Sequence, residues 1–173
     1  MFTKNDIDNY FITYRQEHLF LLLLAAVALV VAIVLYFGIK KHFYKGLAIA
    51  LASFSILFFT TSFSEFKRAD RLRVVNTYNY DLHPEYLKGK ELQRIAAVKK
   101  TINIEFNLGI VIMLAGFALY FYAVKNKHTA YLQGMAIGIV FMVGIAAITF
   151  FVMKNNIVKY ENGVIEFTKI IVV

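Results

Sequence analysis

Four long apolar runs, separated by segments rich in charge, dominate the pattern of hydrophobic and polar positions along the chain. They cover residues 19–39, 46–64, 106–124 and 130–153, and none has an ionisable acidic or basic side chain in its interior. A helix needs about 20 apolar residues to cross the ~30 Å hydrocarbon layer of a bilayer. The pattern therefore predicts an all-α membrane protein whose four transmembrane helices form an antiparallel bundle over residues 19–153.

The composition agrees with this fold class. Of the 173 residues, 60% are hydrophobic and 17% are charged, whereas a soluble domain is usually ~45–50% apolar and ~25% charged. The chain has no cysteine, which excludes disulfides, thiol catalysis and thiolate metal sites. A single membrane domain is expected.

The charged residues are distributed unevenly between the two predicted sides of the membrane. Residues 1–18, 65–105 and 154–173 hold 14 of the 19 Lys and Arg and all 11 Asp and Glu. The positive-inside rule therefore predicts that both termini are cytoplasmic. The net charge of +8 suits contact with anionic headgroups of the bilayer, and no nucleic-acid-binding pattern accompanies it.

The segment 65–105 is predicted to form a cytoplasmic helical hairpin that extends spans two and three. "NYDLHPEY" supplies the turn, and Pro84 with Glu85 suits the first turn of the second helix. Three ion pairs between the two helices would set the register of the hairpin: Arg73–Glu91, Asp70–Arg94 and Glu65–Lys99.

Residues 1–18 place aromatic and aliphatic side chains on one helical face: Ile7, Tyr10, Phe11 and Tyr14. This pattern predicts an interfacial amphipathic helix that lies on the cytoplasmic surface. A straight extension of the first span is the alternative.

The tail, residues 154–173, is predicted to be a short β-hairpin. "IVKYENGVIEF" has β-branched and aromatic residues on both sides of Asn162-Gly163, and Asn-Gly is the strongest short signal for a hairpin turn. Because an isolated two-stranded hairpin is marginal in water, it should pack on the helical hairpin, pair with another copy or accept a partner strand.

Five polar residues are predicted to lie near the cytoplasmic membrane boundary: Glu17, His18, Glu65, Glu105 and Asn107. Ionisable groups at that depth are functional candidates, and the alternative is a ring of interface charges that holds the spans in place. Gly134 and Gly138 form a GxxxG pair in the fourth span. This pair predicts close helix packing, inside the bundle or between protomers of a homo-oligomer.

The sequence has no nucleophile motif, phosphate-binding loop or metal-ligand spacing of its four histidines. No catalytic, cofactor-binding or metal-binding residues are therefore expected. The favoured hypothesis is a non-enzymatic membrane protein whose cytoplasmic hairpin and tail dock a protein partner. The candidate partner-binding residues are Arg68, Arg71, Arg73, Arg94, Tyr160, Val164 and Ile165.

Two alternative functions stay open at this stage. One is an oligomeric ion-conducting pore, with the level of Glu105 and Asn107 as its constriction. The other is a membrane enzyme or lipid-handling protein that would use Glu17, His18, Glu65 and Arg68.

The run "ELQRIAAVKKTINIEFNLGIVIMLAGFALYF", residues 91–121, resembles the third-span entry of small, poorly characterised four-span proteins of the bacterial inner membrane. The shared pattern consists of Glu91, Arg94, Val98-Lys99 and Glu105, and the likeness extends through "GMAIGI" at residues 134–139. Some small bacterial multi-span proteins of this kind are immunity proteins that bind a membrane-active toxin. The resemblance implies a bacterial inner-membrane location and a similar role.

Overall fold

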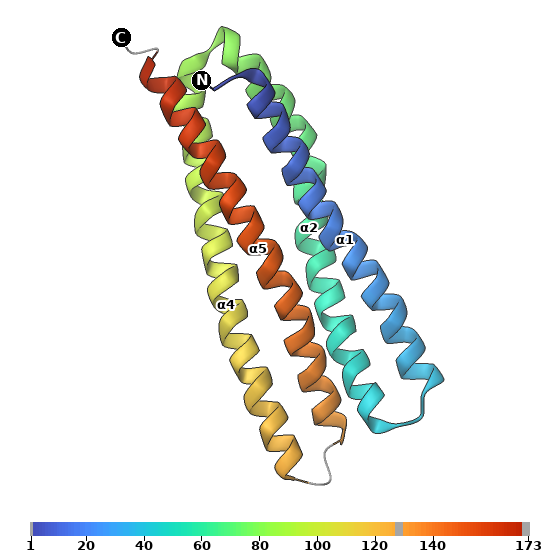
Figure 1. Ribbon diagram of the computed structural model, residues 1–173. Helices are drawn as coiled ribbons and strands as arrows, with labels where there is room; N and C mark the ends of the chain where they lie inside the picture. The colour runs from blue at the N-terminus through green and yellow to red at the C-terminus, as the bar shows by residue number, and fades with distance from the viewer. Residues whose placement is uncertain (1, 127–129, 171–173) are drawn as a thin grey trace.

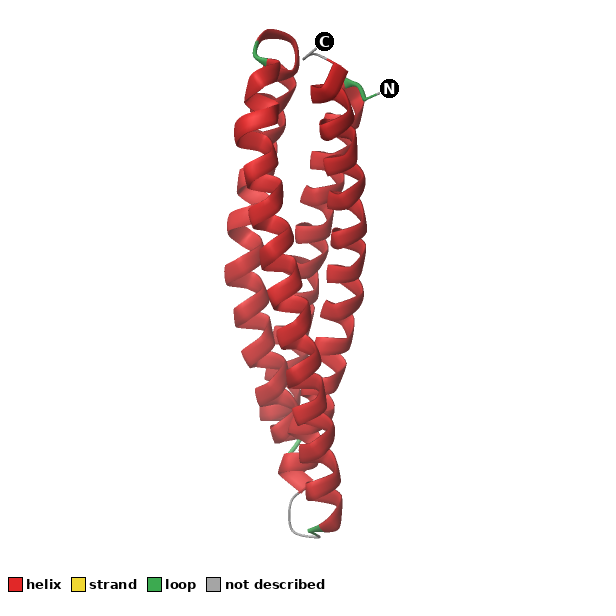
Figure 2. Ribbon diagram, turned by 90° about the vertical axis from the view of Figure 1, so that its left-hand side faces the viewer, coloured by secondary structure: helices red, strands yellow, loops and turns green. Residues whose placement is uncertain are grey.

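The computed structural model describes residues 2–126 and 130–170, and within these the fold is a bundle of four long helices. They are α1 (Lys4–Gly38), α2 (His42–Leu82), α4 (Leu92–Lys125) and α5 (Ala130–Ile170). A short α3 (Pro84–Tyr86) and one π-helical turn, η1 (Leu87–Glu91), join α2 to α4. Consecutive long helices run in opposite directions (Figure 1). The predicted all-α architecture with four long helices is confirmed (Figure 2).

The four helices are long and apolar enough to cross a membrane. Large apolar side chains are exposed on the bundle surface, for example Val27 at 62%, Val111 at 61% and Ile148 at 69%. Both features are those of a multi-pass membrane protein. The 41 residues of α2 span about 60 Å, twice the ~30 Å hydrocarbon layer. The bundle therefore has an apolar half, residues 19–64 and 106–153, and a polar half, residues 2–18, 65–105 and 154–170.

The two halves have different cores. In the apolar half the buried residues are mostly small, and one cluster contains Ala25, Ala28 and Ala32 of α1 with Ala48 of α2 and Ala146 of α5. Small residues suit helices in lipid, where packing rather than the hydrophobic effect drives association.

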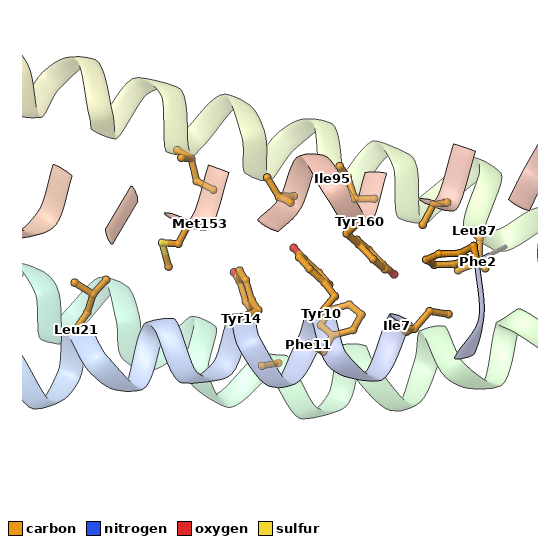
Figure 3. Close-up of a cluster of buried hydrophobic side chains, with 14 residues drawn as sticks. Phe2, Ile7, Tyr10, Phe11, Tyr14, Leu21, Leu87, Ile95, Met153 and Tyr160 are labelled. Carbon is orange, nitrogen blue, oxygen red and sulfur yellow. The ribbon is translucent and has the colours of Figure 1, made fainter. Parts of the chain in front are cut away.

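Large side chains fill the core of the polar half (Figure 3). Phe11, Leu87, Ile95 and Ile157 are each at most 1% exposed, and the ring of Tyr10 stacks on that of Tyr160 with centroids 3.9 Å apart. This core resembles that of a soluble bundle. Water around the polar half makes the burial of such side chains favourable.

Glycines bring α2 and α5 into close backbone contact. A Cβ atom added at Gly134 would lie 1.9 Å from the carbonyl oxygen of Phe43, and one added at Gly46 would lie 1.9 Å from that of Tyr131. α2 and α5 are the second and fourth long helices, so this contact crosses the bundle. α1 packs along α2, and α4 along α5 (Figure 1), whereas α2 and α4 have little direct contact in the part that the structure describes. The glycine contact thus leaves the edge between α2 and α4 open.

The predicted C-terminal β-hairpin is wrong, because the described part of the tail, residues 154–170, continues α5. Ile157, Tyr160 and Val164 follow helical spacing and are at most 4% exposed, so core packing overrides the local turn signal. Gly163 serves a close approach instead of a turn, since a Cβ there would lie 2.4 Å from the ring of Phe2. Residues 171–173 of the predicted hairpin lie outside the described residues.

The three ion pairs predicted between the helices of the 65–105 segment are also wrong. The turn lies where expected, with Pro84 in the first turn of α3. However, α1 and α5 extend into the polar half beside this segment and supply other partners. The residues of the predicted pairs instead form Arg68–Glu65, Arg15–Asp70, Arg73–Asp70, Arg94–Glu91 and Lys99–Glu161.

Residues 4–18 do not form a separate interfacial helix. They are the first turns of α1, which continues without interruption into the apolar half. The face with Ile7, Tyr10, Phe11 and Tyr14 is buried in the core of the polar half. An apolar stripe on a helix can be buried against protein as well as against lipid, and here α2 and α5 cover it. Residues 4–18 therefore form a straight extension of the first span, which was the alternative considered in the sequence analysis.

Candidate functional site

A lateral groove opens between α2 and α4 where the polar half meets the apolar half. Its polar chamber has a volume of about 430 Å³, within the range of ligand pockets. α2 and α4 form the walls, and Leu21 of α1 with Phe150 and Met153 of α5 contribute to the floor. The chamber has six ionisable lining residues: Tyr14, His18, Glu65, Arg68, Arg94 and Glu105.

A smaller apolar end, with a volume of about 130 Å³, extends the groove into the apolar half. Phe54 and Leu57 of α2 face Leu108 and Ile112 of α4 across it, and Val143 of α5 lies on its floor. Phe58, Thr61, Glu105 and Phe150 line both the chamber and the apolar end. The two therefore form one continuous groove that changes from polar to apolar along its length.

Glu65 is the centre of a hydrogen-bonded group in the polar chamber. Its carboxylate accepts a hydrogen bond from the Tyr14 hydroxyl at 2.8 Å and another from the Arg68 guanidinium at 2.9 Å. The ring of His18 packs edge-on against that of Tyr14, and its Nδ1 atom is buried without a hydrogen-bond partner among the described residues. Tyr14 therefore uses its one donor on Glu65 and Arg68 uses part of its donor capacity, whereas His18 Nδ1 is unengaged.

A second charged pair reaches the chamber through Arg94. Arg94 donates two hydrogen bonds to Glu91, at 2.9 and 2.7 Å, and its guanidinium lies 5.1 Å from the ring centroid of Phe11. The Glu91 side chain is only 2% exposed. Burial raises the pKa of the adjacent Tyr10 hydroxyl, in the polar half, to about 12. This pair satisfies two buried charges and holds Arg94 in place.

The structure brings together three of the five predicted boundary residues, since His18, Glu65 and Glu105 all line the polar chamber. Glu17 points elsewhere and accepts a hydrogen bond from Asn156 of α5 at 2.6 Å. Asn107 is exposed and does not line the groove. Glu105 and Asn107 therefore do not form a common constriction within one chain.

The predicted partner-binding residues are scattered. Tyr160 and Val164 lie in the core, and Ile165 is half-buried. Arg73 is half-buried and lies 4.0 Å from Asp70, whereas Arg71 is exposed. Only Arg68 and Arg94 line the groove. The GxxxG residues, Gly134 and Gly138, pack against α2 inside the bundle.

Several groove residues escaped the sequence analysis as parts of a site, notably Tyr14, Phe58, Ser64 and Gly109. Tyr14 looked like one more residue of an amphipathic face, and an apolar residue in a predicted span carries no sign of which neighbour it faces. Gly109 offered a signal, because a glycine leaves room beside its helix, but Gly116 in the same predicted span offered the same one. Gly109 is a small residue in α4 whose added Cβ would meet only Val143, at 3.6 Å.

Comparison with known proteins adds no relative to this picture. No protein-family model matches the sequence, and no curated protein or solved structure is significantly similar to it. The function is therefore argued from the groove itself.

Proposed function

We propose that this protein is a non-enzymatic integral membrane protein that binds a lipid-like amphipathic molecule in the lateral groove between α2 and α4. The observation that supports the proposal is the continuity of the groove, which leads from a chamber lined by charged side chains to an apolar end. A phospholipid has the same order of chemistry along its length. This proposal develops the lipid-handling function, which the sequence analysis considered as an alternative on the basis of the polar residues near the membrane boundary.

The position of the groove matches the position of a lipid in a bilayer. The polar chamber lies at the ends of the four apolar stretches that adjoin the polar half, at the proposed level of the headgroups, and the apolar end lies within the apolar half. A lipid could enter sideways from the membrane, since α2 and α4 have little contact that would close this edge. Its acyl chain would cover exposed Leu57 and Leu108 without losing contact with the bilayer.

We further propose that the polar half is cytoplasmic and that the membrane is the inner membrane of a bacterium. The support for the orientation is the excess of Lys and Arg on the segments of the polar half. The groove would then bind lipids of the cytoplasmic leaflet.

The proposal predicts that filling the apolar end of the groove displaces lipid. In Gly109→Leu the added side chain enters this end, and the mild contact of a Cβ with Val143 at 3.6 Å indicates that the helices need not move apart. The purified variant should lose most of the phospholipid that the unmodified protein retains in mild detergent, as measured by native mass spectrometry.

Gly144→Leu is the matched control, because Gly144 is adjacent in sequence to Val143, does not line the groove, and has open space around its Cβ position. It should retain lipid like the unmodified protein. Equal lipid retention by the Gly109 and Gly144 variants, or no lipid bound to any form, would contradict lipid binding in the groove.

A further inference from the structure

The acceptor and donor groups of the polar chamber are not balanced, and this imbalance restricts the ligand. Glu65 is engaged by Tyr14 and Arg68, and Arg94 by Glu91. Glu105 also lines the chamber, but no cation lies within ion-pair distance of its carboxylate in the part of the chain that the structure describes. One carboxylate at the membrane boundary is thus left for a ligand to neutralise.

Two hydroxyls on α2 that line the same chamber as Glu105 add further acceptors. Thr61 donates its hydroxyl proton to the carbonyl oxygen of Leu57 at 3.0 Å, and Ser64 donates to that of Thr61 at 3.2 Å. Each hydroxyl has one proton and two lone pairs, so both oxygens keep the capacity to accept. A ligand group near Glu105, Thr61 and Ser64 is therefore best recognised if it is positively charged and carries N–H donors.

A donor for an anionic group lies at the mouth of the same chamber. The Arg68 side chain is 53% exposed, and a single nitrogen, Nη1, is bonded to Glu65. A guanidinium has five N–H donors, and its planar geometry suits phosphate oxygens. The chamber thus offers a phosphate site at Arg68 and an ammonium site at Glu105.

We infer that the lipid bound in the groove is an aminophospholipid, whose primary ammonium pairs with Glu105 and whose phosphate pairs with Arg68. This inference rests on the proposed function, and it adds the headgroup class to it. A primary ammonium has three N–H donors for the acceptors of the chamber, whereas a trimethylammonium headgroup has none and a glycerol headgroup has no positive charge.

The test is a competition among three lipids with identical acyl chains: phosphatidylethanolamine, phosphatidylcholine and phosphatidylglycerol. Each is added to delipidated full-length protein in detergent, and bound lipid is counted by native mass spectrometry. Phosphatidylethanolamine should bind about tenfold more tightly than the other two, the change expected for one charge-assisted hydrogen bond. Glu105→Gln should remove this preference because it removes the charge that pairs with the ammonium.

Glu85→Gln is the matched control, since Glu85 is exposed in α3 and does not line the groove; it should keep the preference. Arg68→Gln should weaken binding of all three lipids, because all three carry a phosphate. Equal binding of the three lipids, or a preference for phosphatidylglycerol, would contradict the inferred aminophospholipid headgroup. It would not contradict the proposed binding of a lipid in the groove. A Glu105→Gln protein that keeps the preference would overturn the inferred headgroup as well. Failure of all three lipids to bind would overturn the proposed function itself.

Discussion

Gly134→Ala is expected to weaken the bundle strongly, as is Gly46→Ala at the matching position of the facing helix. The new Cβ would lie 1.9 Å from the carbonyl oxygen of Phe43 and 2.8 Å from its carbonyl carbon. These are backbone atoms of a packed helix, so no side chain can rotate away and α2 must separate from α5. The expected loss is about 3 kcal/mol, at the upper end of the range for overpacking, or a fall of roughly 6–12 °C in Tm for a chain of this size. Thermal unfolding in detergent measures it.

Gly144→Ala is the control on the same helix, because no atom outside its immediate helical surroundings lies within 4 Å of the Cβ position at Gly144. Alanine is a better helix former than glycine by about 1 kcal/mol, so this variant should be unchanged or slightly more stable. If Gly134→Ala unfolds at the same temperature as the Gly144 variant, the close contact between α2 and α5 is not as described.

Arg94→Ala is expected to cost about 3–5 kcal/mol, because it leaves the Glu91 carboxylate buried without its charge partner. The Glu91 side chain is 2% exposed and that of Arg94 is 17% exposed, so water cannot replace the guanidinium readily. The contact of Arg94 with the Phe11 ring is lost at the same time. A fall in Tm, measured in detergent at neutral pH, reports the loss.

Arg68→Ala is the matched control for Arg94→Ala. Arg68 and Glu65 also form an i, i+3 pair, but the Arg68 side chain is 53% exposed, and an exposed pair contributes only ~0–1 kcal/mol. The double variant Glu91→Leu/Arg94→Leu should recover most of the stability lost in Arg94→Ala, since it removes both buried charges. A double variant as unstable as Arg94→Ala would show that the lost stability comes from packing rather than from the unpaired carboxylate.

The sequence predicted the long apolar helices because their signal is local. An uninterrupted run of about 20 apolar residues is sufficient for a span, and Pro84 marked the start of a helix by its own geometry. In contrast, the Asn162-Gly163 pair has a true local preference for a turn, which the burial of Tyr160 and Val164 overrides. A local signal fails where distant residues decide the conformation.

The groove could not be predicted because it depends on which helices touch. Gly134 and Gly138 were recognised as a close-packing pair, but their spacing does not reveal whether the partner is α1, α2 or another protomer. The choice of α2 brings the second and fourth long helices together and leaves α2 and α4 apart. Glu65 and Glu105 were identified as boundary residues, yet only this arrangement places them in one chamber.

The same reasoning explains why the ion pairs of the polar half were predicted incorrectly. Charges on α2 and α4 were assigned to each other because these helices are consecutive. In the bundle, Asp70 pairs with Arg15 of α1 at 3.2 Å and Lys99 pairs with Glu161 of α5 at 2.5 Å. Opposite signs at matching positions are common among 30 charged residues, so sign agreement alone does not choose a neighbour.

The occupancy of the groove can be measured directly with a phosphatidylethanolamine that carries a diazirine in its acyl chain. The lipid is bound to the purified protein at a low molar ratio and irradiated, and the modified residues are mapped by peptide mass spectrometry. A groove lipid should modify Leu57, Leu108 and Ile112, which line the apolar end, and leave Val27 and Val30 of α1, exposed on the bundle surface, near background. Adducts distributed evenly over both sets of residues would contradict a lipid site between α2 and α4.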